Sequence, residues 1–95
     1  MRGMVQALKA SPLPTVVYVG PQGARATSAG LFIALAADIV AMAPATHIGA
    51  AHPIPLGAEV GEVMEAKAIS DAAAFARSLA ASRDVQVAEW AERAV

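Results

Sequence analysis

The sequence predicts an α/β fold in which short parallel strands alternate with helices. A β-branched run from Thr15 to Val19 is typical of a strand, and a second run of this kind covers Ile39 to Ala43. Between them lies an apolar segment, from about Ser28 to Ala37, that is long enough for a helix. Strands that alternate with helices along a chain favour a parallel sheet in a layered α/β arrangement.

The N-terminal segment, residues 1–10, has the spacing of a helix. Its apolar side chains share one face: Met1, Met4, Val5 and Leu8. Ser11, Pro12 and Pro14 end this helix. The strand that follows, Thr15 to Val19, is continuously apolar, so we expect it to be buried on both faces.

The middle of the chain is predicted as loop, helix and strand. A Gly/Pro loop covers Gly20 to Gly23, and the helix from about Ser28 to Ala37 is apolar nearly all round, which predicts burial. Asp38 interrupts the apolar pattern, and the strand Ile39 to Ala43 comes next.

The C-terminal half is predicted to be mostly helical. Residues 44–55 are irregular apart from a brief strand in HIGAA, and Leu56 to Glu65 is a polar loop. A third helix is expected from Glu65 to Ser82 and a last one from Val87 to Ala94. The third helix has one apolar face, formed by Ile69, Ala72, Ala76 and Leu79, with Phe75 beside them.

The size of the chain suggests a part of a larger domain. A chain of 95 residues buries only roughly 60–65% of its unfolded surface. Two or three strands also leave the edges of the sheet unprotected. We therefore expect residues 1–95 to be a partial domain, with further strands before Met1, after Val95, or both.

Composition excludes several classes of function. The net charge of −1 gives no basic stripe for nucleic acid, and the absence of cysteine excludes disulfides and thiolate-bound metals. The longest apolar run, AGLFIALAADIVAMAP, carries Asp38, so no segment is expected to span a membrane. Glu59, Glu62 and Glu65 have no histidine at ligand spacing, which indicates a solvated loop. No metal and no cofactor is expected.

Ser28 is the first candidate for chemistry, because sites in α/β sheets lie where a strand ends and the next helix begins. The free N–H groups and partial positive charge of a helix N-terminus would stabilise a developing oxyanion. Serine is also a favoured N-cap, which needs no catalytic role. The nucleophile-elbow pattern G-x-S-x-G is absent here. Both interpretations of Ser28 remain open from these residues alone.

Two downstream residues could serve a serine nucleophile as its base. One is His52, because histidine is the side-chain type that can act as a base near neutral pH without help. Lys67 would need a strongly lowered pKa, which small apolar neighbours and a position in the first helical turn would favour. Alternatively, His52 is an ordinary loop histidine and Lys67 a solvated surface lysine.

The segment PTVVYVGPQGARATSAGLFIALAADIVAMAPATHIGAAHPI resembles the NfeD family of membrane-bound, ClpP-class serine proteases. The family pattern has P-x-G-x-x-A-x-S-A-G before an apolar helix, then I-x-M-A-P and I-G-A-x-x-P-I. The matching residues are Pro21, Gly23, Ala26, Ser28, Ala29, Gly30, Met42, Ala43, Pro44, Ile48, Gly49, Ala50, Pro53 and Ile54. The helix KAISDAAAFARSLAASR is also similar, with Lys67 at the position of the family's lysine.

The resemblance implies a role for each matching residue. Ser28 would be the nucleophile and Lys67 the general base of a Ser-Lys dyad, with the N–H of Ala29 as one oxyanion donor. The fold would be an incomplete portion of the ClpP/crotonase stacked βαβ spiral. The glycine-rich turn that supplies the second oxyanion donor would precede Met1.

The resemblance also implies partners and a location. Family members are similar to proteases that cut hydrophobic stretches of membrane-associated proteins, stomatin-like proteins in particular. A peptide or protein substrate and a homo-oligomer are therefore expected. The full-length protein would be membrane-associated, with the protease domain extracytoplasmic or peripheral and this segment itself soluble.

Three alternatives remain. A histidine at a similar distance is the base in soluble Clp proteases, so His52 could serve Ser28, with an acidic partner beyond Val95. A crotonase-like acyl-CoA enzyme would share the superfold, although no acidic residue stands beside Ser28. A non-catalytic fragment or assembly module would be held together by apolar surface.

Overall fold

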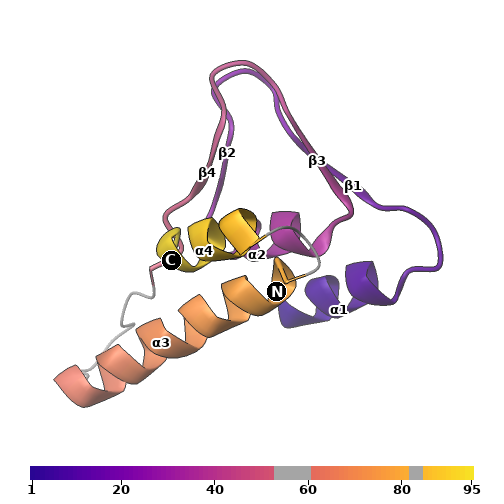
Figure 1. The fold of residues 1–95 in the computed structure, drawn as a ribbon. Coiled ribbons are helices and arrows are strands. Elements are labelled where there is room, and N and C mark those ends of the chain that lie inside the picture. Colours follow the sequence, from indigo (N-terminus) through magenta and orange to yellow (C-terminus); the bar gives the residue numbers. More distant parts are fainter. Residues whose placement is uncertain (53–60, 82–84) are drawn as a thin grey trace.

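The computed structural model of the chain describes residues 1–52, 61–81 and 85–95. Within these ranges, helices and short strands alternate along the first half, and helices make up the second half (Figure 1). The elements are α1 (Arg2–Ala10), β1 (Val16–Val19), β2 (Arg25–Thr27), α2 (Ala29–Ala36), β3 (Ile39–Met42), β4 (His47–Gly49), α3 (Glu62–Leu79) and α4 (Val85–Arg93).

The strands pair in parallel, β1 with β3 and β2 with β4, which confirms the predicted parallel α/β arrangement. The two pairs form one continuous two-stranded ribbon that bends sharply between them. From this bend, the β1–β3 pair and the β2–β4 pair diverge toward the helices (Figure 1). Backbone bonds continue across the bend, from Ala43 N to Val19 O (2.9 Å) and from His47 N to Ala24 O (3.3 Å). The arrangement is compatible with an incomplete ClpP-like fold.

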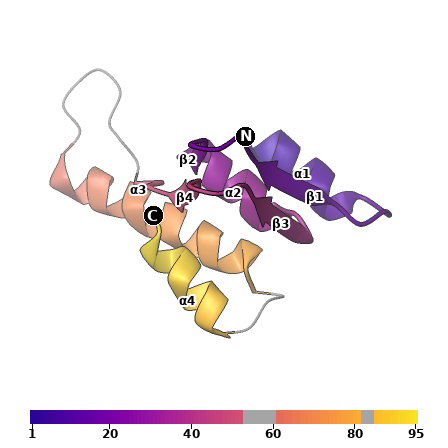
Figure 2. The ribbon, with the colours of Figure 1, turned by 90° about the horizontal axis from the view of Figure 1, so that it is seen from above.

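Helix α2 is the centre of the core, as its apolar sequence predicted. Leu31 and Ala34 are completely buried, because α1 and α3 both pack against α2 (Figure 2). Helix α4 packs along α3 through small side chains, and small side chains let two helices approach closely. The buried cluster consists of Val5, Leu31, Phe32, Leu35, Ala36, Ala51, Ala76, Leu79, Ala80, Ala88 and Ala91.

Asp38, which interrupts the apolar pattern, joins the beginnings of β1 and β3. Its Oδ2 accepts hydrogen bonds from the Thr15 backbone N–H (2.8 Å) and hydroxyl (3.3 Å), and its own N–H donates to Thr15 Oγ1 (3.1 Å). Ile39 N also donates to Thr15 O (3.1 Å). These bonds fix the register of the pair in which Val16 lies opposite Ile39.

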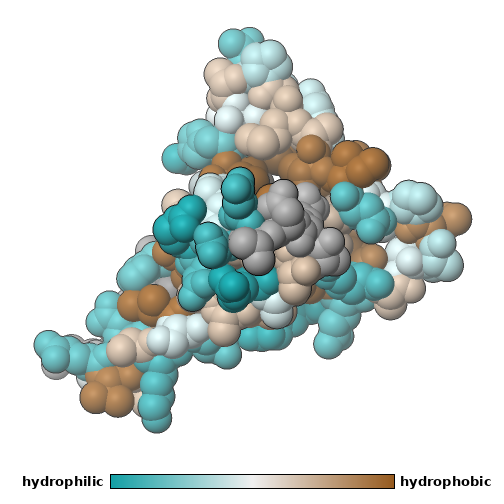
Figure 3. Space-filling view, viewed as in Figure 1, coloured by the Kyte–Doolittle hydropathy of each residue, from teal (hydrophilic) through white to brown (hydrophobic). Residues whose placement is uncertain are grey.

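The expectation that β1 is buried on both faces is wrong. Val16 and Tyr18 are 59% and 66% exposed, and Ile39 on the neighbouring strand is 55% exposed. Successive side chains of a strand point to opposite faces, and the helices cover only one face of this ribbon. Apolar atoms therefore lie at the surface near β1 and β3 (Figure 3).

Other expectations needed smaller corrections. Strand β2 was not predicted, and three residues give too little alternation to be recognised. Helix α3 begins at Glu62 instead of Glu65, so both glutamates lie in its first turn, where the helix dipole favours them. In α1, Val5 is buried, whereas Met4, predicted on the same face, is 57% exposed.

Two predictions concern residues outside the described ranges, namely residues 56–60 of the Leu56–Glu65 loop and Glu59 among them. The third helix ends at Leu79 instead of Ser82. Among the described helices, none is both long enough and apolar enough to cross a membrane.

Candidate active site

Ser28 lies in a sharp turn between β2 and α2, with φ 55° and ψ −124°. These angles are favourable for glycine and strained for a residue with a Cβ, and such strain is concentrated at functional sites. A serine held in a strained turn between a strand and a helix is the geometry of a nucleophile elbow. The strand that leads to Ser28 is β2, whereas the sequence had suggested β1.

The sequence around Ser28 keeps the second glycine of an elbow, Gly30, and has the small residue Ala26 in place of the first. A Cβ added to Gly30 would lie 3.4 Å from the Cβ of Ala26, so the strand and helix are in close contact at this point. The pattern small-x-Ser-x-small therefore forms the turn that G-x-S-x-G forms in other hydrolases. A search for small residues on both sides of the serine would have found this turn.

The hydroxyl of Ser28 does not cap α2. Ser28 occupies the N-cap position, but its side chain makes no capping hydrogen bond, and its backbone is outside the extended region that N-caps adopt. Only its carbonyl takes part, accepting from Leu31 N (3.1 Å). The helix-cap interpretation thus leaves the hydroxyl unexplained.

The N–H groups of Ala29 and Gly30 are the first of α2. Within the described part of the chain, neither donates a backbone hydrogen bond outside the helix, and a first-turn N–H has no partner inside it. Such free donors at a positive helix end can bind an oxyanion. The structure thus leaves the N–H of Ala29 available for the predicted role.

A pocket of about 350 Å³ opens beside Ser28, between the N-terminal ends of α1 and α2 and one face of α3. Its walls are largely apolar, and Arg2 and Asp71 contribute the charged side chains. The lining residues are Met1, Arg2, Ser28, Ala29, Phe32, Ala51, Ala68, Asp71, Ala72 and Phe75. A concave apolar pocket with a few polar groups is the usual form of a binding site.

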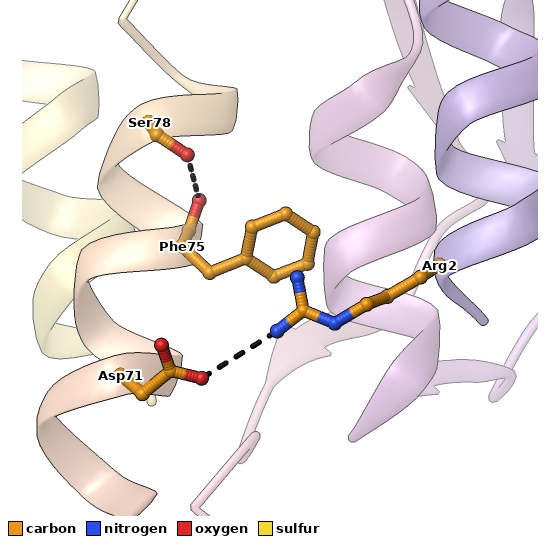
Figure 4. Close-up of polar contacts among 4 residues, drawn as sticks. All are labelled: Arg2, Asp71, Phe75 and Ser78. Atoms are coloured by element: carbon orange, nitrogen blue, oxygen red, sulfur yellow. Dashed lines mark hydrogen bonds and ion pairs between the residues drawn. The ribbon is translucent and has the colours of Figure 1, made fainter. Parts of the chain in front are cut away.

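Arg2 reaches from α1 to α3 at the edge of this pocket (Figure 4). Its guanidinium lies 4.2 Å from the centre of the Phe75 ring, and an amino nitrogen is 3.5 Å from Asp71 Oδ2. Phe75 in turn stacks on Phe32, with the ring centres 5.4 Å apart. An exposed cation–π contact and an exposed ion pair each contribute about 1 kcal/mol or less to the stability of the fold.

Neither candidate base lines the pocket. Lys67 precedes the lining residue Ala68 in α3, and His52 follows the lining residue Ala51. Both side chains are exposed. Lys67 lies in the second turn of α3 instead of the first, because the helix begins earlier than predicted. The expected burial of Lys67 among small residues is therefore absent from this structure.

The structure therefore brings Ser28 and Ala29 together at the pocket and places Lys67 and His52 next to its walls. Among the residues that the structure describes, no group of acidic or histidine side chains could hold a metal ion. A serine in an elbow-like turn, free N–H groups and an adjoining pocket on a parallel α/β frame define the arrangement of a serine hydrolase.

Comparison with known proteins points to a membrane-bound protease. No family model matches the sequence. A membrane-bound protease of Pyrococcus horikoshii is 41% identical over 93 residues, which are 94% of this chain and 21% of that protein.

Solved structures that are similar to this chain are also those of membrane-bound proteases. A serine-to-alanine variant of a membrane-bound, stomatin-specific protease matches 99% of this chain and 46% of its own, with 37% identity and a TM-score of 0.83. A lysine-to-alanine variant of such a protease, in complex with a substrate peptide, matches with 36% identity and a TM-score of 0.75, over 96% of this chain and 42% of its own.

These findings confirm the resemblance to the NfeD-type membrane-bound proteases. The chain spans about a fifth of the length of the curated relative and less than half of the solved chains.

Proposed function

We propose that residues 1–95 form the central part of a serine endopeptidase domain, with Ser28 as the nucleophile. The observation that carries this proposal is the strained turn at Ser28, which presents an uncapped hydroxyl to a pocket. The names of the solved relatives support it, since they include a serine-to-alanine variant and a complex with a substrate peptide.

In this mechanism the Oγ of Ser28 attacks the carbonyl carbon of the scissile peptide bond. The carbonyl oxygen becomes an oxyanion and accepts a hydrogen bond from the N–H of Ala29. Lys67, as a neutral amine, takes the hydroxyl proton and later gives it to the leaving amine. The acyl-enzyme is then hydrolysed by water, which returns Ser28 to its starting state.

The assignment of the base to Lys67 depends on its place in α3. The neighbouring residue Ala68 lines the pocket, so the long lysine side chain begins at the edge of the site. A lysine is a base only when its amine is neutral, and removal from water favours the neutral form. Since Lys67 is exposed here, we propose that bound substrate covers the amine and completes the dyad.

The substrates of the whole protein are proposed to be hydrophobic segments of membrane-associated proteins. The apolar walls of the pocket suit such segments, and the relatives are named as specific for stomatin or a stomatin homologue. The whole protein is proposed to act at a membrane and as a homo-oligomer.

The test is cleavage of an apolar peptide by the full-length protein and its variants. Ser28→Ala and Lys67→Ala are each expected to abolish cleavage, whereas His52→Ala is expected to retain most of it. Ser70→Ala, at an exposed serine of α3, is the matched control and is expected to leave the rate unchanged.

Two outcomes would overturn parts of this proposal. Cleavage that survives in the Lys67→Ala variant but not in His52→Ala would replace the dyad by a Ser-His mechanism. Cleavage that survives in Ser28→Ala would remove Ser28 from the reaction.

A further inference from the structure

We propose that Arg2 determines the size of the substrate side chain that the pocket beside Ser28 accepts. This inference rests on the proposed function for its substrate, a peptide whose cleaved bond lies at Ser28. The side chain that flanks this bond would enter the adjoining pocket, and its apolar walls favour an apolar side chain.

The walls of the pocket differ in how deeply their side chains are packed into the core. Helix α2 contributes Phe32 from the buried core, and α3 contributes Phe75, which stacks on it. On the side of the pocket that faces α1, the lining residues are Met1 and Arg2. Arg2 is therefore the charged side chain that closes this wall.

Arg2 is held across the pocket although most of its side chain is in contact with solvent. Its guanidinium lies over the face of the Phe75 ring, and Asp71, one helical turn before Phe75, accepts its hydrogen bond (Figure 4). The side chain covers aromatic surface that an entering substrate group would otherwise contact. Removing it would lengthen the pocket along the face of Phe75.

The position of α1 does not depend on Arg2. At the other end of this helix, Lys9 Nζ donates to the backbone carbonyl of Leu79, at the end of α3 (3.1 Å). Val5, in the middle of α1, is buried in the core. Truncation of Arg2 should therefore enlarge the pocket while leaving α1 in place.

The expected effect is a change in selectivity between small and large apolar side chains. A single methylene group in an apolar pocket changes discrimination by about 10–200-fold. An arginine side chain is much larger than a methylene, so Arg2→Ala should shift the preference toward a bulky aromatic group by at least about tenfold.

The experiment measures binding of two peptides to the full-length protein in a Ser28→Ala background, so that no cleavage is needed. The peptides differ only in the residue that precedes the cleaved bond, alanine in one and tryptophan in the other. Arg2→Ala is expected to lower the ratio of the Kd for the tryptophan peptide to that for the alanine peptide at least about tenfold.

Arg77→Ala is the matched control. Arg77 is also an exposed arginine in an ion pair, with Glu92 (2.9 Å), but neither residue lines the pocket. Its removal is expected to leave the ratio of the two Kd values unchanged.

A general structural effect of Arg2→Ala would weaken both peptides alike, and an unchanged ratio would overturn the inference. Cleavage by the protein with Ser28 intact is measured separately. If the protein with Ser28 intact does not cleave the peptides but Arg2→Ala still changes the ratio of the two Kd values, the proposed function is contradicted. The inference that Arg2 selects side-chain size would then still hold.

Discussion

Replacing Ser28 by glycine should stabilise the protein while removing its nucleophile. The backbone of Ser28 has φ 55° and ψ −124°, a conformation that glycine adopts without strain. A strained residue of this kind costs about 1–3 kcal/mol, and the greater freedom of glycine in the unfolded chain offsets roughly 0.5–1 kcal/mol of the gain. The net stabilisation should be about 0.5–2 kcal/mol.

Thermal unfolding followed by circular dichroism would measure this effect. In a domain of this size each kcal/mol moves Tm by about 4–8 °C, so Ser28→Gly should raise Tm by roughly 2–16 °C. Ser28→Ala keeps the Cβ and loses only a hydroxyl that caps nothing, so its stability should change by about 0.5 kcal/mol or less.

Ala29→Gly supplies the control for glycine itself. Ala29 is the first residue of α2 and is not among the residues with positive φ, so glycine there should destabilise the protein by up to about 1 kcal/mol. If Ser28→Gly were no more stable than Ser28→Ala, Ser28 would not be strained, and the elbow-like geometry would lose its main support.

Substitutions at three further positions test the packing and hydrogen bonding of the fold by the same unfolding measurement. Leu31→Ala should cost about 3–5 kcal/mol because the side chain is completely buried, whereas Leu31→Met should cost less than about 1.5 kcal/mol. Asp38→Ala should cost about 1–3 kcal/mol by leaving Thr15 without its acceptor, and Asp38→Asn, which keeps one acceptor oxygen, should cost less. Lys9→Met should cost about 1–2 kcal/mol by removing the bond to Leu79 O. Equal stability of the alanine and conservative variants at residue 31 or 38 would contradict these assignments.

The central elements of the fold could be predicted because their sequences are strongly patterned. Helix α2 is apolar on all sides, and this composition is typical of a helix buried in a core. Strands β1 and β3 are β-branched runs on either side of it, so their parallel pairing followed from the order of elements.

The features that were missed depend on interactions between segments. Strand β2 is too short to show a period, and it is defined by its pairing with β4 across the bend of the ribbon. The exposed faces of Val16 and Tyr18 could not be inferred from an apolar run, because the sequence does not tell which faces the helices cover.

The candidate site was predictable in part. The place of Ser28 at the start of a buried helix was visible, but its backbone angles, φ 55° and ψ −124°, could not be inferred from the residue types. Of the two environments considered for Lys67, the structure shows the solvated one, and α3 begins three residues earlier than expected.

Reaction of the full-length protein with a serine-directed fluorophosphonate tests the central claim most directly. The expected result is one adduct on the peptide that contains Ser28, absent from Ser28→Ala and formed much more slowly in Lys67→Ala. Unmodified Ser28 in a protein that still cleaves peptides, or an adduct on a different serine, would contradict the account.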